Sequence, residues 1–184
     1  MKRGIHFSTR IRAELLLLLL FGIAGTLANA ATPSVAVLDI ELTGDLGGPE
    51  LSPEHQARIS KESAYMRAEL AATGQYRIVD TGPAEALVGR LKTEYLYLHD
   101  CNGCDLQIAR ALGADEILIS WVNRVSALIL TLTYEIHEAS TGRIVARKSY
   151  DFRGDNDAAW THAIGFMIRH LKDDSGDAPD SSTP

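Results

Sequence analysis

The sequence predicts an α/β (α+β) fold, in which helices pack on a mixed sheet of about five strands. Three patterns lead to this prediction. Residues 35–40, VAVLDI, form a continuous apolar run that is typical of a buried central strand. Residues 128–136 alternate in polarity as a half-buried strand does, and residues 160–171 carry apolar side chains at helical spacing. The expected order is strand, helix, strand, two helices, three strands and helix.

The first half of this order alternates strands with helices. After the first strand and a loop at 41–51, Ser52 and Pro53 have the order of a helix N-cap and a first-turn proline. This helix should end near Gly74, and the stretch YRIVDT after it should be the second strand. A further helix should run over residues 82–95, opened by a Gly-Pro pair.

The second half is predicted to be a short helix, an antiparallel meander and a final helix. Apolar residues follow one side of the short helix, which Gly113 can terminate. The strands EILISWV, LILTLTYEI and RIVARKSYDF come next, and the middle strand should bury Leu128 and the alternate residues after it. Asp155 or Asn156 should cap the final helix. Its expected buried residues are Trp160, Ile164, Met167, Ile168 and Leu171.

Residues 1–30 have the organisation of a secretory signal peptide. Basic residues precede the apolar run LLLLLLFGIAGTLA, and the segment closes on the small-residue motif ANA before Ala31. The run is shorter than the roughly twenty residues that a spanning helix needs, so no stable membrane anchor is expected after cleavage. Residues 31–172 should then form one α/β domain. Residues 173–184 should be a disordered acidic tail, because they contain no large apolar side chain.

The charge balance makes nucleic acid a poor partner. The chain has 18 Lys and Arg residues against 24 Asp and Glu residues. Four of these basic residues and one acidic residue fall in the predicted signal peptide, so the exported chain has a net charge near −9. Such a chain should repel nucleic acid and anionic lipid surfaces. We expect it in the periplasm or secreted, after export by the general secretory route, in an oxidising space.

The only two cysteines, Cys101 and Cys104, form the motif CNGC. Haem attachment is excluded, because it needs a histidine where Asp105 stands. The Asn-Gly pair favours a tight turn, which predicts a structural disulfide. Two alternatives stay open. A thiol–disulfide oxidoreductase would use Cys101 as its nucleophile, although Asp100 and Asp105 oppose thiolate formation. A zinc site would need ligands beyond the nearby His99. We expect no metal and no cofactor.

A few other side chains are candidates for chemistry. Asp39 and Glu41 share one side at the end of the first strand, where they could bind a cation or act as acid and base. Hydrogen bonding to loop amides is the favoured interpretation. His137 should face solvent, and Trp121 and Trp160 should lie in the core. The sequence contains no phosphate-binding glycine loop, nucleophile elbow or metalloprotease helix.

Several stretches together resemble a known family. VAVLDI, LAATGQYRIVD, ARALGADEILISWV and LTYEIHEASTGRIV lie between about residues 34 and 171. They resemble the amino-terminal domain of TolB and its relatives, the curli secretion lipoprotein CsgG and periplasmic activators of cell-wall synthases. CNGC with the downstream RGD and AAW also resembles an uncharacterised family of secreted bacterial proteins. The resemblance implies a TolB N-terminal-like fold and a periplasmic docking or assembly role.

The sequence therefore predicts a non-enzymatic interaction or assembly module of the bacterial cell envelope, whose partner is another envelope or secreted protein. The alternatives are a periplasmic thiol–disulfide oxidoreductase that uses CNGC, and a small-ligand binder. Contact residues are expected in the 41–51 loop and around the disulfide, since binding residues often lie on loops held by a rigid scaffold. They are Glu41, Asp45, Leu51, His99, Asp100, Asn102 and Asp105.

Overall fold

The computed structural model describes residues 32–48 and 50–174. The predicted signal peptide and residues 175–184 of the predicted acidic tail lie outside the described residues. Within the described part, no helix combines the length and the apolar character that crossing a membrane requires.

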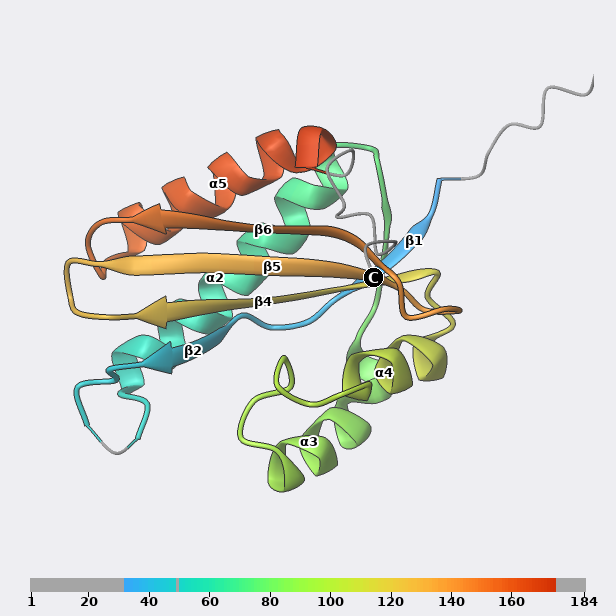
Figure 1. Cartoon of the computed structure of the whole chain (residues 1–184), viewed down its shortest axis with the longest axis horizontal. Helices are drawn as coiled ribbons and strands as arrows, with labels where there is room; N and C mark the ends of the chain where they lie inside the picture. The colour runs from blue at the N-terminus through green and yellow to red at the C-terminus, as the bar shows by residue number, and fades with distance from the viewer. Residues whose placement is uncertain (1–31, 49, 175–184) are drawn as a thin grey trace, which may run out of the picture. The chain divides into compact units, whose positions relative to one another are not determined.

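The described chain forms a mixed six-stranded sheet with helices packed on it, so the predicted α/β fold is confirmed (Figure 1). The strand order is β3-β1-β4-β5-β6, and β2 also pairs with β4. β1 pairs in parallel with β3 and β4, whereas β4, β5 and β6 form the predicted antiparallel meander. The elements are β1 (Ser34–Val37), β2 (Glu41–Gly44), α2 (Pro53–Ala72), β3 (Arg77–Val79), the 3₁₀ turn η1 (Gly82–Ala84), α3 (Glu85–Glu94), α4 (Cys104–Leu112), β4 (Glu116–Arg124), β5 (Leu130–Glu138), β6 (Ile144–Phe152) and α5 (Asp157–Asp174).

The first predicted strand ends early, at Val37, and β2 forms at the start of the stretch 41–51 that was predicted to be a loop, which is why the sheet has six strands and not about five. β1 and β2 both pair in parallel with β4, one after the other. Between them the amide of Ile40 turns to the hydroxyl of Ser63 on α2, at 3.0 Å. The carboxylate of Asp39 turns outward to Arg67, with Oδ1 and Nη2 2.6 Å apart. The acidic side chain inside the apolar run therefore marks the break.

The two faces of the sheet carry different helices. α2 and α5 pack against each other on one face (Figure 1). α3 and α4 pack on the other face, around Ile108 of α4 and Ile117 of β4. The prediction for the last helix is confirmed, since the five residues expected to be buried are no more than 6% exposed: Trp160, Ile164, Met167, Ile168 and Leu171.

β5 follows the predicted alternation but starts later than predicted. Its alternate residues Leu130, Leu132, Tyr134 and Ile136 are fully buried. Leu128 was predicted to belong to this set, and that prediction was wrong, because Leu128 lies in the β4–β5 turn and is 69% exposed. The hydroxyl of Ser126 accepts hydrogen bonds from the amides of Leu128 and Ile129, which favours a turn over a strand there.

Candidate interaction site

The disulfide corner, residues 95–105, connects α3 to the start of α4. Cys101 and Cys104 are bonded to each other, with Cα atoms 5.6 Å apart, so the predicted disulfide is present. Gly103 between them has a φ of 91°, a left-handed conformation that favours glycine, and Cys104 is the first residue of α4. The two cysteines are 8% and 4% exposed and lie among apolar residues of α3, α4 and β4.

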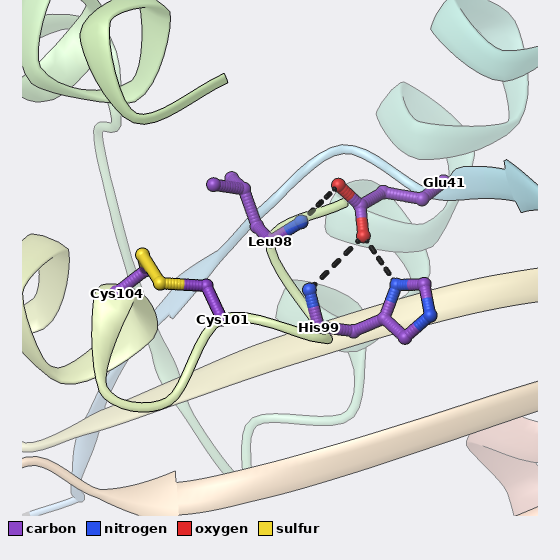
Figure 2. Close-up of a disulfide and its surroundings, with 5 residues drawn as sticks. All are labelled: Glu41, Leu98, His99, Cys101 and Cys104. Atoms are coloured by element: carbon purple, nitrogen blue, oxygen red, sulfur yellow. Dashed lines mark hydrogen bonds and ion pairs between the residues drawn. A yellow bond between two sulfur atoms is a disulfide. The ribbon is translucent and has the colours of Figure 1, made fainter. Parts of the chain in front are cut away.

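Glu41 holds the loop that precedes the disulfide (Figure 2). Its carboxylate accepts hydrogen bonds from the amides of Leu98, at 2.8 Å, and His99, at 3.2 Å, and lies 2.6 Å from Nδ1 of His99. The ring of His99 stacks on the half-buried Trp121, with centroids 4.4 Å apart. Glu41 thus accepts loop amides, as the favoured interpretation predicted, and has different partners from Asp39. Among the described residues, no three His, Cys, Asp or Glu side chains are grouped to hold a metal ion.

His137 lies behind the disulfide corner, so the prediction that it faces solvent was wrong. Its Nδ1 is 2.6 Å from Oδ2 of Asp105 in the first turn of α4, and its Nε2 is 2.7 Å from the carboxylate of Glu135. The hydrogen bond with Asp105, and next that with Glu135, raises the pKa of His137 to about 9 although burial opposes this. The charged imidazolium therefore ties α4 to β5 at neutral pH.

A second surface region, the hairpin end, consists of the β4–β5 turn at 125–129 and the neighbouring loop residues at 45–48, 50–51 and 153–155. The turn exposes three apolar side chains: Val125 at 58%, Leu128 at 69% and Ile129 at 47%. Exposed apolar residues that gather on one turn are a common feature of protein interaction sites. The sequence did not predict an exposed turn here, because Leu128 and Ile129 were predicted to start a strand.

Main-chain hydrogen bonds join the β4–β5 turn to the 153–155 loop, and the end of β4 to the loop that begins at Asp45. The amide of Gly154 donates to the carbonyl of Leu128 at 3.3 Å, and the amide of Asp155 to that of Ala127 at 2.9 Å. On the other side, the amide of Asp45 donates to the carbonyl of Arg124 at 2.8 Å. The exposed turn is thus fixed to the 153–155 loop, and the end of β4 just before the turn is fixed to Asp45.

Asp155, in the 153–155 loop of the hairpin end, binds four side chains with its carboxylate. Its carboxylate accepts from Arg124 Nε at 2.7 Å, Arg58 Nη1 at 3.0 Å and Trp160 Nε1 at 3.2 Å, and lies 2.9 Å from His55 Nε2. Burial opposes its ionisation, but the hydrogen bonds with His55 and Arg124 and the charges of His55 and Arg58 outweigh burial, so the pKa of Asp155 lies below its usual value. The ionised Asp155 joins α2, β4 and α5.

The predicted cap of the last helix is Asn156, and Asp155 has a different role. Oδ1 of Asn156 accepts a hydrogen bond from the amide of Ala159 at 3.1 Å. The buried Arg58 was not among the predicted site residues. The sequence held one signal for it, since His55, Arg58, Glu62 and Met66 follow one another at helical spacing. The structure buries all four, so polar residues extend the apolar stripe of α2.

The predicted contact residues divide into surface and interior positions. Asp45, Asp100 and Asn102 are exposed, and Leu51 is half-buried. The other three side chains lie in the interior and stabilise the disulfide corner. They are Glu41 at 11% exposed, His99 at 10% and Asp105 at 5%. The structure brings Glu41 and His99 together, but Asp45 and Leu51 belong to the hairpin end and not to the corner.

Comparison with known families gives one assignment. The family described as "Protein of unknown function (DUF2380)" matches residues 33–171. The chain belongs to this family. No curated protein matches it.

Solved structures similar to this chain include those of three bacterial proteins. The LpoB C-terminal domain from Salmonella enterica has 16% identity and a TM-score of 0.46, over 65% of this chain and 82% of that chain. The PelC dodecamer from Paraburkholderia phytofirmans has 15% identity and a TM-score of 0.45, over 78% and 86%. TolB from Acinetobacter baumannii has 10% identity and a TM-score of 0.44, over 77% of this chain but only 28% of that chain.

Proposed function

We propose that this chain is a non-catalytic protein-interaction module of the bacterial cell envelope, and that it docks another envelope or secreted protein through the hairpin end. The exposed apolar side chains of Val125, Leu128 and Ile129 support this proposal most directly. Because hydrogen bonds to the 153–155 loop already fix the turn, docking would lose little conformational entropy.

Two features support a place in the periplasm or outside the cell. The first thirty residues have the sequence of a secretory signal peptide. The bonded Cys101–Cys104 pair fits an oxidising compartment, since cytosolic thiols are kept reduced. We propose export by the general secretory route, with signal cleavage before Ala31.

The disulfide corner supports a structural role for the cysteines over the oxidoreductase alternative. A redox-active pair needs an accessible sulfur and a stabilised thiolate. Both cysteines are buried, and Glu41 holds the preceding loop in place. We expect no insulin reduction by the purified protein and, after chemical reduction, no thiol pKa well below that of ordinary cysteine. Turnover with a dithiol substrate would favour the oxidoreductase instead.

Site-specific photo-crosslinking in the producing bacterium tests the docking proposal. A photoreactive residue in place of Leu128 should give one discrete adduct with an envelope or secreted protein, which mass spectrometry can identify. The same residue in place of Gln107, exposed on α4, should give no such adduct. Absence of any adduct from Leu128, or the same adducts from both positions, would contradict docking at the hairpin end.

A matched pair of substitutions separates the hairpin end from the disulfide corner. Leu128→Asp and Leu96→Asp each place a charge at an exposed leucine, 69% and 82% exposed, so both variants should stay folded. With the photoreactive residue at Val125, Leu128→Asp should abolish the adduct and Leu96→Asp should keep it. The reverse result would move the docking surface to the corner.

A further inference from the structure

A cleft lies at the carboxyl end of β3, the short edge strand of the sheet. β3 ends at Val79, whereas the neighbouring β1 continues through the break at Asp39 into β2. From there the chain passes to α2 on one face of the sheet, and from β3 it passes to α3 on the other face. In open α/β sheets, ligands bind outside the carboxyl ends of strands where the connections diverge in this way.

The cleft has the size of a small-molecule site. Its volume is about 390 Å³, within the range of roughly 300–1,000 Å³ that such sites occupy. Leu38, Val88 and Leu98 provide its apolar surface. Asp80, Glu85 and Lys92 provide groups of both charges, all from the segment that follows β3.

The opposite charges of Glu85 and Lys92 on α3 are too far apart along the helix to form an ion pair with each other. Glu85, Val88 and Lys92 follow at helical spacing, so they share one side of α3 in the order acid, apolar, base. Seven residues separate the acid from the base, a rise of about 10 Å along the axis. Within the part of the chain that the structure describes, no hydrogen bond or ion pair joins Glu85 or Lys92 to another side chain.

Arg67 and Asp39 close the cleft on the side of α2. Arg67 is held in place, since its Nε donates to the carbonyl of Val37 at 3.0 Å and its Nη2 to Asp39. Asp80 accepts a hydrogen bond from the amide of Gly82 at 3.0 Å through one oxygen only. Among the charged groups that line the cleft, Asp80, Glu85 and Lys92 are therefore the ones that no other described side chain binds.

We propose that this cleft binds a small zwitterion of dipeptide length, with its ammonium group at Glu85 and Asp80, its carboxylate at Lys92 and an apolar side chain against Val88 and Leu98. An extended dipeptide spans about 7 Å, at roughly 3.5 Å per residue. With a hydrogen bond of about 3 Å at each end, the ligand bridges about 13 Å, which the long side chains of Glu85 and Lys92 can span from backbone positions about 10 Å apart along α3. The site goes beyond the proposed docking function and does not depend on it.

Titration of the ¹⁵N-labelled chain with the dipeptide Ala-Leu, followed by NMR, tests the site. Saturable shifts are expected for the amides of Leu38, Thr81, Gly82 and Val88, which line or adjoin the cleft. The same peptide with an acetylated amino end and an amidated carboxyl end should not bind, because it has lost both charges.

Single substitutions locate the two charged contacts. Glu85→Gln and Lys92→Gln should each raise the Kd for Ala-Leu about tenfold, as the loss of one charge-assisted hydrogen bond does. Glu94→Gln is the matched control, because position 94 lies half a turn away from Glu85 around α3. The proposal is overturned if no saturable shift appears by about 10 mM, if the blocked peptide binds equally, or if all three variants bind alike.

Discussion

At the residue scale, two carboxylates hold surface segments of the described fold in place. Glu41, at the start of β2, binds the loop before the disulfide, and Asp155 binds side chains beneath the hairpin end. Each carboxylate has an ordinary role for a buried acid, which must be hydrogen-bonded or paired. Glu41 thus fixes the disulfide corner, where contact residues were expected, and Asp155 fixes the hairpin end, whose exposed turn was not predicted.

Replacement of Asp155 by asparagine keeps the side chain's shape but removes its charge. Asp155→Asn should lower the free energy of unfolding at pH 7 by about 3 kcal/mol, since it leaves Arg58 and Arg124 without this buried counter-charge. Because the pKa of Asp155 is lowered, its contribution is present above the ordinary aspartate pKa, and it is lost as the pH falls below about 4. Urea unfolding across this range measures the gap between wild type and variant.

Asp157→Asn is the control for this experiment. Asp157 binds the same Arg58, but its side chain is 50% exposed, so solvent screens the pair. It should reduce stability far less than Asp155→Asn. Equal effects of the two changes would show that burial at Asp155 is unimportant.

His137 should make stability depend on pH in the alkaline range. Its pKa is raised to about 9 in the folded chain, so its contribution is complete below an unfolded pKa of about 6.5 and is lost as the pH rises towards 9. After allowance for partial exposure, His137→Gln should lower the free energy of unfolding by about 2 kcal/mol at pH 6, with a smaller gap at pH 9. His162→Gln, an exposed change on α5, should leave the pH dependence unaltered. A gap that widens towards pH 9 would contradict this account.

At the scale of elements, local patterns predicted most helices and strands, because periodicity and capping act over a few neighbouring residues. The stripe from Trp160 to Leu171 and the tight turn at Asn102–Gly103 are of this kind. Contacts between distant segments were not predictable. Arg58 lies 97 residues from Asp155, and Glu41 lies 58 residues from His99, so no local pattern joins either pair.

The last helix should be essential to the fold. Ile164 is 1% exposed between α5 and the sheet, so Ile164→Asp places a charge in the core and should prevent stable folding. His162→Asp adds the same charge on the exposed side of α5 and should unfold at nearly the wild-type temperature. Circular dichroism during heating compares the two variants, and equal melting temperatures would contradict the packing of α5.

At the scale of the whole molecule, the predicted export signal and the disulfide concern the same compartment. The signal sequence predicts passage out of the cytoplasm, and the bonded Cys101–Cys104 pair is suited to an oxidising space. The two features are independent, because one depends on residues 1–30 and the other on a turn between α3 and α4. A single measurement on the exported protein can test both.

Intact-mass spectrometry of the chain purified from the envelope fraction without detergent is that measurement. The main species should begin at Ala31, because the apolar run before it is too short to remain as an anchor and ANA is a typical cleavage motif. Its mass should be that of the oxidised chain, and reduction should add one hydrogen to each of Cys101 and Cys104. Expression without residues 1–30 in a reducing cytosol provides the dithiol form for comparison. Retention of residues 1–30 in the membrane fraction would contradict cleavage, and free thiols in the exported protein would contradict a structural disulfide.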